Sequence, residues 1–166
     1  MEAVDLPLEK ELIFVDDNST DGTREILAGL SGKHKVTYQD KNQGKGAAVK
    51  KGFRAATGDI VLIQDADLEY NPQDYPALIK PIINGAADVV YGSRFLSRSL
   101  ASGSNKIVYR HGYLFSQGLN WLSNVLSGVH LTDMYTCYKV FSKEAIDQIW
   151  PRLTSKRFGI DPELTA

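Results

Sequence analysis

The carboxylate pair Asp65 and Asp67 has the clearest chemical use in the sequence. It follows an apolar run, residues 59–64, that predicts a buried strand leading into a loop. Two carboxylates at one site favour a hard divalent cation, and Glu69 is a candidate for a third oxygen ligand. Because Mg²⁺ and Mn²⁺ complete their coordination with phosphate oxygens, the pair predicts a metal site for a diphosphate. The same acids would also suit a turn that caps the next helix.

Three further segments place polar groups after predicted strands. Asp16 and Asp17 end the apolar segment 11–17, where carboxylates can accept hydrogen bonds from a sugar or a base, or cap the next helix. Lys45 lies between two glycines and offers an ammonium and nearby backbone N–H groups to phosphate, without the spacing of a P-loop. Arg94 can neutralise a leaving diphosphate or form a surface ion pair.

The elements that must position these groups alternate between strand and helix. The predicted strands span residues 11–17, 35–39, 59–64, 88–91 and 134–141, and the predicted helices span 24–30, 47–57, a segment from Pro72, 106–126 and 142–150. This alternation, with strands apolar on both faces, predicts an α/β domain with a mostly parallel sheet flanked by helices. Ligands of such sheets bind beyond the carboxyl ends of the strands, so we expect the polar groups to converge there.

The predicted helix 106–126 has an apolar side formed by Tyr113, Leu114, Leu119, Trp121, Leu122, Val125 and Leu126. Packing on the sheet is the favoured interpretation, and a position on a membrane surface is the alternative. No apolar run reaches the roughly 20 residues that span a bilayer, and the acidic start does not resemble a signal peptide. We therefore expect a cytoplasmic protein, peripheral to a membrane where it meets one.

The composition fits one soluble domain: 166 residues, 43% hydrophobic and 23% charged. A net charge of −1 argues against nucleic acid as a partner. The single cysteine, Cys137, excludes a multi-cysteine metal site. Charge is unevenly distributed, because residues 89–132 contain no acid and four bases, Arg94, Arg98, Lys106 and Arg110. Such a segment favours a surface that meets phosphates or lipid head groups.

Five segments, in order along the chain, resemble family 2 glycosyltransferases, and in particular the polyprenyl-phosphate branch that includes dolichyl-phosphate mannosyltransferase. They are residues 14–23, 42–52, 65–69, 91–95 and 133–141. The resemblance implies a GT-A fold, with residues 1–166 forming one catalytic domain that is incomplete at both ends and lacks the family's first strand. It also implies a Mg²⁺ or Mn²⁺ cofactor.

The implied reaction is inverting transfer of a hexose from a nucleotide-diphosphate sugar, of the GDP-mannose or UDP-glucose type, to a polyprenyl or dolichyl phosphate at a membrane surface. An acceptor phosphate is largely ionised at neutral pH, with a second pKa of roughly 6, so it needs little help from a base. A hydroxyl acceptor would need one, and Asp133 is the candidate.

The resemblance also implies roles for individual residues. The nucleotide sugar is expected at Asp16, Asp17, Asn18, Lys45, Asp65, Ala66 and Asp67, and the metal at Asp65, Asp67 and Glu69. Asp67, Arg94 and Asp133 are the expected catalytic residues, and Arg94 and Lys139 are expected to face the acceptor phosphate.

Three other functions compete with this one. A sugar nucleotidyltransferase shares the sheet and the metal, but usually shows a glycine-rich signature at its first strand. A receiver domain fits poorly, because it requires a single phosphorylatable aspartate at the end of a separate strand. A fragment that binds nucleotide weakly, without catalysis, is the third.

Overall fold

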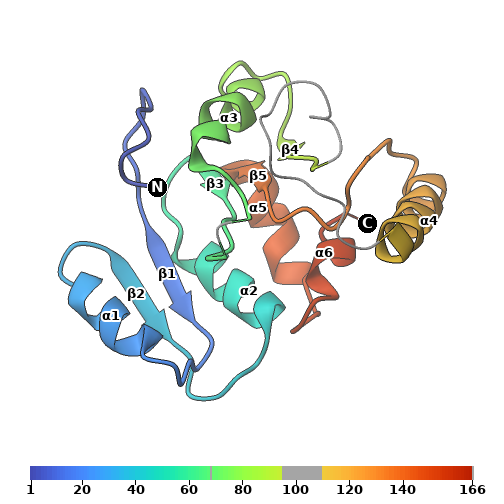
Figure 1. Cartoon of the computed structure of the whole chain (residues 1–166). Helices are drawn as coiled ribbons and strands as arrows, with labels where there is room; N and C mark the ends of the chain where they lie inside the picture. Colours follow the sequence, from blue (N-terminus) through green and yellow to red (C-terminus); the bar gives the residue numbers. More distant parts are fainter. Residues whose placement is uncertain (68, 95–109, 166) are drawn as a thin grey trace.

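The computed structural model describes residues 1–67, 69–94 and 110–165, and within helix α4 it describes the side chains of residues 117–126. The elements in chain order are β1 (Ile13–Asp16), α1 (Thr23–Leu30), β2 (Lys35–Tyr38), α2 (Lys45–Ala55), β3 (Ile60–Leu62), the 3-10 turn η1 (Pro72–Asp74), α3 (Tyr75–Ile83), β4 (Val89–Tyr91), α4 (Arg110–Ser127), β5 (Lys139–Ser142), α5 (Lys143–Ile149), the 3-10 turn η2 (Trp150–Arg152) and α6 (Ile160–Glu163) (Figure 1). Helices alternate with strands, which confirms the predicted α/β class.

The strands pair in two groups. β1 and β2 are parallel, with Phe14 opposite Val36. β5 lies between β3 and β4 and runs antiparallel to both, with Phe141 opposite Val61 and Val140 opposite Val90. The parallel pairing that we expected is therefore present between β1 and β2, whereas both pairings of β5 are antiparallel.

The sequence pattern predicts that this strand begins at Met134, but β5 begins at Lys139. Side-chain hydrogen bonds hold the preceding residues in place of a strand ladder. The Thr136 hydroxyl donates to the Gly92 carbonyl, and the Tyr70 hydroxyl accepts from Cys137 N at 2.9 Å. These contacts place the segment before β5 across the end of β4.

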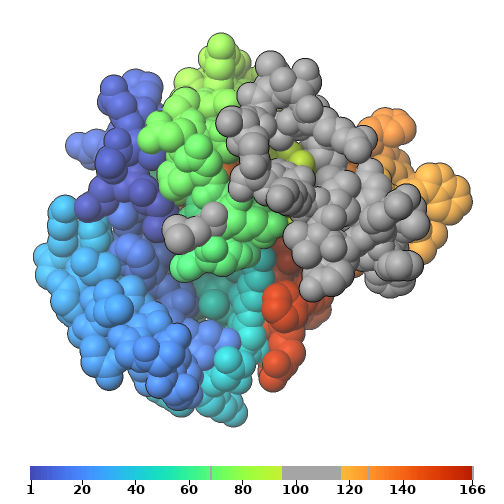
Figure 2. Space-filling view, in the orientation of Figure 1, coloured from blue at the N-terminus to red at the C-terminus, as the bar shows by residue number. Residues whose placement is uncertain are grey.

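The core consists of two apolar clusters that share β5. Val140 belongs to a cluster with Val4, Tyr75, Leu78, Ile79 and Tyr138, and Phe141 belongs to one with Phe53, Ile146, Leu153, Ile160 and Leu164. Successive side chains of a strand point to opposite faces, so neighbouring residues of β5 fill both clusters. The N-terminal residues, dark blue in Figure 2, lie against α3, shown in green, where Val4 is buried. All four residues of β5 are buried, Lys139 included.

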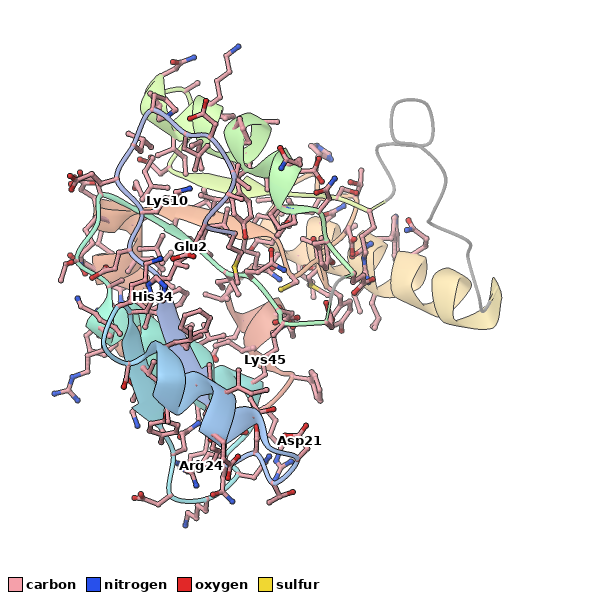
Figure 3. The ribbon with its side chains drawn as sticks, turned by 60° about the vertical axis from the view of Figure 1, so that its left-hand side comes forward. Glu2, Lys10, Asp21, Arg24, His34 and Lys45 are labelled. Carbon is pink, nitrogen blue, oxygen red and sulfur yellow. The ribbon has the colours of Figure 1, made fainter. Side chains whose placement is uncertain are left out.

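We expected helix α4 to pack its apolar side on the sheet, but the apolar side chains that the structure describes near its C-terminal end are mostly exposed. The helix projects from the body of the molecule (Figures 1 and 3), and Trp121 is 68% exposed, with Leu122, Val125 and Leu126 also exposed. A polar residue, Asn120, is buried on its inner side. The expected start of this helix at Lys106 lies outside the described residues, as do Arg98 and the side chains of Arg110, Tyr113 and Leu114. Within the described part of the chain, no helix has the length and apolar character to span a membrane.

Candidate active site

Lys45 and Asp65 meet where α2 begins and β3 ends. The Lys45 ammonium lies 2.9 Å from Asp65 Oδ2 and 3.6 Å from Asp161 Oδ2. Burial opposes the charge of Lys45, but the hydrogen bond to Asp65 and the charge of Asp161 outweigh it and raise the pKa of Lys45. A cation is therefore fixed beside the carboxylate that the sequence assigns to the nucleotide sugar. Figure 3 labels Lys45.

Lys139 forms a buried ion pair behind Lys45. Its side chain is 0% exposed, and its Nζ donates to Asp161 Oδ1 at 2.6 Å and to the Thr136 carbonyl. Burial lowers the pKa of Lys139 despite the nearby carboxylate. The expected contact of Lys139 with an acceptor phosphate is thus not available in this structure, because the strand that carries Lys139 lies in the core. Asp161 links Lys139 to Lys45, a role that no local sequence pattern indicates.

Arg94 and Asp133, two of the expected catalytic residues, form a two-point ion pair. Arg94 Nε lies 2.7 Å from Asp133 Oδ2 and Nη2 lies 3.0 Å from Oδ1. Hydrogen bonding to Asp133 raises the pKa of Arg94 further above its ordinary value. Glu69, expected at the metal, instead accepts from Arg94 Nη1 at 3.1 Å. The end of β4, the loop after β3 and the segment before β5 therefore meet at Arg94.

Asp16 organises the turn after β1. Its carboxylate accepts from Asn18 N and Ser19 N, both at 3.1 Å, and pairs with Arg24 Nε at 3.1 Å. Burial raises the pKa of Asp16, but the hydrogen bonds from Ser19 outweigh it, so the net shift is downward. Asn18 has a φ of 66° and accepts from Arg24 Nη1. The structure thus gives Asp16 and Asn18 partners within the protein at this turn.

Asp17 links β1 to the glycine-rich loop before α2. One oxygen accepts from Gln43 N at 2.7 Å and from Gln39 Nε2 at 2.8 Å, and the other accepts from Gly44 N at 2.7 Å. The loop that leads into Lys45 is therefore held by the carboxylate expected at the nucleotide. Asp17 contributes to the site by fixing this loop.

The three carboxylates expected at the metal each have a hydrogen-bond partner within the protein. Asp67 Oδ1 accepts from Glu69 N at 3.0 Å, and Asp65 Oδ2 is bound by Lys45. No group of three metal-ligating side chains gathers anywhere among the described residues. Asp65 and Asp67 supply hard oxygen donors, which suits a divalent ion that takes its other ligands from a diphosphate. Glu69 Oε1 accepts from Arg94 Nη1, and the role of Glu69 as a third ligand stays a prediction.

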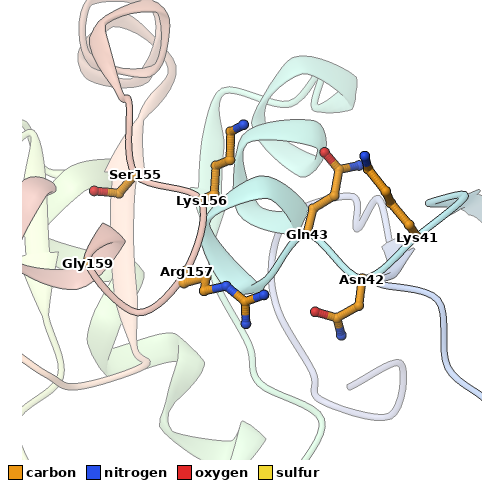
Figure 4. Close-up of a pocket in the computed structure, with 7 residues that line it drawn as sticks. All are labelled: Lys41, Asn42, Gln43, Ser155, Lys156, Arg157 and Gly159. Carbon is orange, nitrogen blue, oxygen red and sulfur yellow. The ribbon is translucent and has the colours of Figure 1, made fainter.

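A hollow of about 530 Å³ adjoins the loop that Asp17 holds (Figure 4). It is lined by Lys41, Asn42, Gln43, Ser155, Lys156, Arg157 and Gly159. Its two walls are joined by a hydrogen bond from Ala47 N to the Lys156 carbonyl at 2.9 Å. A Cβ added at Gly46 would lie 2.6 Å from the Ser155 carbonyl, so only glycine allows this approach. Three cationic side chains and no carboxylate line the hollow, which favours an anionic ligand.

The sequence of this chain is similar to a known protein family and to several of its named members. Residues 3–150 match Glycosyl transferase family 2. The chain is 42% identical to a dolichol-phosphate mannosyltransferase from Pyrococcus furiosus over 91 residues, 54% of this chain and 26% of that protein. It is 34% identical to a dolichyl-phosphate beta-glucosyltransferase from Trichomonas vaginalis over 93% of this chain and 47% of that protein. The chain therefore spans at most about half the length of these two relatives.

Solved structures confirm the fold. The glucosyl-3-phosphoglycerate synthase of Mycobacterium tuberculosis, a GT-A enzyme, matches with a TM-score of 0.67 and 24% identity over 93% of this chain and 52% of that one. The same synthase in complex with Mg²⁺ and uridine diphosphate matches with a TM-score of 0.65 and 25% identity. With its α/β architecture and its match over residues 3–150, the chain belongs to glycosyl transferase family 2 and has the GT-A fold.

Proposed function

We propose that this domain transfers a hexose from a nucleotide-diphosphate sugar to a polyprenyl or dolichyl phosphate, with inversion at the anomeric carbon. The observation that carries the proposal is that two fixed cations, Lys45 and Arg94, both form ion pairs with carboxylates of the loop after β3. Relatives named for dolichyl-phosphate sugar transfer support the acceptor class.

On the donor side, Asp65 and Asp67 would hold a Mg²⁺ or Mn²⁺ ion. When bound, such an ion neutralises charge on the diphosphate and so favours its departure. Lys45 adds a fixed positive charge at the same place, and the cations of the adjoining hollow raise the local concentration of an anionic donor. The complexes of the mycobacterial synthase with Mg²⁺ and uridine diphosphate support this arrangement.

On the acceptor side, a phosphate oxygen attacks the anomeric carbon while the bond from that carbon to the donor phosphate oxygen breaks. The acceptor is already largely ionised at neutral pH, with a pKa of roughly 6, so no general base is required. Asp133 has both oxygens on Arg94 and is 1% exposed. Its task is then to orient Arg94, whose charge offsets that of the phosphates.

Contact with a membrane follows from the exposed face of α4. Trp121, Leu122, Val125 and Leu126 form one exposed apolar side of the described part of this helix. The surrounding segment, residues 89–132, contains no acid. An apolar helix face without negative charge suits an anionic lipid surface, where a lipid phosphate acceptor resides.

Thermal unfolding of the protein with UDP-sugars and GDP-sugars, with and without Mn²⁺, tests the donor part of the proposal. Stabilisation that requires both one donor and the metal is the expected result. A transfer assay then compares a polyprenyl phosphate with 3-phosphoglycerate as acceptors. Turnover with 3-phosphoglycerate alone would overturn the lipid acceptor, and absence of any donor-dependent stabilisation would overturn transfer from nucleotide sugars.

A further inference from the structure

Two asparagines on the inner side of α4 bind the backbone of the segment that carries Asp133. Asn120 Nδ2 donates to the Thr132 carbonyl at 2.9 Å, and Asn120 Oδ1 accepts from Met134 N at 2.9 Å. Asn124, one helical turn later, donates to the Leu131 carbonyl at 2.8 Å and accepts from Leu131 N at 2.9 Å. The two side chains lie on one helix face because residues four apart are neighbours there.

The two asparagine side chains supply the backbone hydrogen bonds that a neighbouring strand would otherwise supply. Among the described residues, 131–134 pair with no strand. Each asparagine amide instead pairs with a backbone N–H and a carbonyl, as a peptide group would. Asn120 is only 3% exposed, so its bonds are shielded from water. Removal of this amide would leave the N–H of the buried Met134 without its partner and would release the Thr132 carbonyl, which loosens the segment.

The residue between those two backbone groups is Asp133. Asn120 binds the residue before it and the residue after it, while Asp133 itself binds Arg94 through both carboxylate oxygens. Thr132 also bonds to Ser93, the residue before Arg94, at 2.7 Å between the two hydroxyl oxygens. The position of the Arg94 guanidinium is thus set by a chain of contacts that ends on α4.

We propose that Asn120 and Asn124 are positioning residues: they hold residues 131–134 against α4 so that Asp133 presents the Arg94 guanidinium to the reacting phosphates. The proposal rests on the proposed function for its catalytic consequence, and on the hydrogen bonds alone for its structural part. It also gives α4 two distinct faces, since the apolar side chains point outward while the asparagines bind the site segment. The orientation of Arg94 therefore depends on α4, an element outside the apolar core.

The test compares Asn120→Ala and Asn124→Ala with Asn84→Ala, an exposed asparagine at the end of α3 that makes no side-chain hydrogen bond among the described residues. Amide exchange at Leu131 and Met134 and the NMR signal of the Arg94 Nε–H group report the contacts directly. We expect roughly tenfold faster exchange at these amides and a displaced Arg94 signal in the two variants, with neither change in the control.

Kinetics separate positioning from general damage. We expect kcat to fall by about tenfold or more, with the KM for the nucleotide sugar and the donor-dependent thermal shift within about twofold of the parent protein. Asn124→Asp keeps the acceptor for Leu131 N but loses the donor, so an intermediate kcat is expected. It also serves if the alanine variants fail to fold.

Two results would overturn the proposal: an Arg94 signal that stays in place, or an unchanged kcat in a variant whose amides exchange faster. If the parent protein transfers no sugar, the proposed function fails separately. In that case the Arg94 signal alone decides whether the asparagines position this residue.

Discussion

Arg94 and Asp133 are joined at two points, with Nε 2.7 Å from Oδ2 and Nη2 3.0 Å from Oδ1, and the Arg94 backbone N also donates to Oδ2 at 3.2 Å. Planar, paired contacts of this kind fix the orientation of a guanidinium as well as its charge. Asp133 has little exposed surface with which to meet an acceptor. The sequence favours Asp133 as a base for a hydroxyl acceptor, and the structure favours it as the support of Arg94.

Asp133→Asn tests that reassignment. We expect kcat to fall by about 10- to 100-fold, the usual range for a lost hydrogen bond to a charged group. The loss should be similar with a phosphate acceptor and a hydroxyl acceptor, because both depend on Arg94. Initial rates with the two acceptors measure it, with the exposed Asp147→Asn as the control. A loss confined to the hydroxyl acceptor would restore Asp133 as a general base.

Asp67→Ala and Glu69→Gln separate the two views of the metal site. We propose Asp67 as a metal ligand, whereas the Glu69 carboxylate already accepts a hydrogen bond from Arg94. We therefore expect Asp67→Ala to abolish the Mn²⁺-dependent part of the donor thermal shift, and Glu69→Gln to preserve it. Thermal unfolding with donor, with and without Mn²⁺, measures both. Equal loss in the two variants would return Glu69 to the metal.

Asp161→Asn tests the ion pair behind Lys45. The substitution leaves the Lys139 ammonium buried without its charge partner, and removal of one member of a buried pair costs about 3–5 kcal/mol. Urea unfolding should show a loss of this size, with Glu144→Gln on the exposed side of α5 as the control. A loss below about 1 kcal/mol, as is typical of exposed pairs, would contradict the described burial of Lys139.

Glu163 predicts a specific dependence of stability on pH. Burial raises the pKa of Glu163, but hydrogen bonds from Thr154 and Ser155 outweigh it and lower the pKa from 4.5 to about 2. A carboxylate with a lowered pKa stabilises the fold above its unfolded pKa, and this contribution disappears as pH falls through the folded value. Denaturant midpoints at pH 6 and pH 3 should therefore differ more in the parent protein than in Glu163→Gln. Identical acid dependence in the two proteins would contradict the assignment.

The exposed face of α4 predicts binding to lipid. Replacement of Trp121, Leu122 and Val125 by serine should weaken sedimentation with anionic vesicles, because the apolar area available for insertion is removed. Ile26→Ser is a matched control, since Ile26 is an exposed apolar residue of α1 and not of α4. If the triple variant and the control bind vesicles as the parent protein does, α4 is not the lipid-facing element.

Short-range patterns were sufficient for much of the fold. Runs of apolar residues marked β1 to β4, and glycine and proline marked the limits of several helices. The loops after β1, β3 and β4 were predicted as the site because parallel strands place their carboxyl ends together. The predicted start of β5 was wrong because Thr136 and Cys137 form hydrogen bonds with Gly92 and Tyr70. Local propensity contains no information about those distant partners.

The sequence by itself determined which ionisable groups lie at the strand ends, since periodicity and turn residues act over a few neighbouring positions. Only the tertiary structure decided how those groups pair. Arg94 and Asp133 are 39 residues apart, and Lys139 and Asp161 are 22 apart. A charge acquires its function from the groups that packing brings within about 4 Å of it, because Coulomb energies and burial depend on distance in space. For that reason the sequence alone predicts Lys139 as a ligand for phosphate, whereas in the folded protein its ammonium is buried and pairs with Asp161.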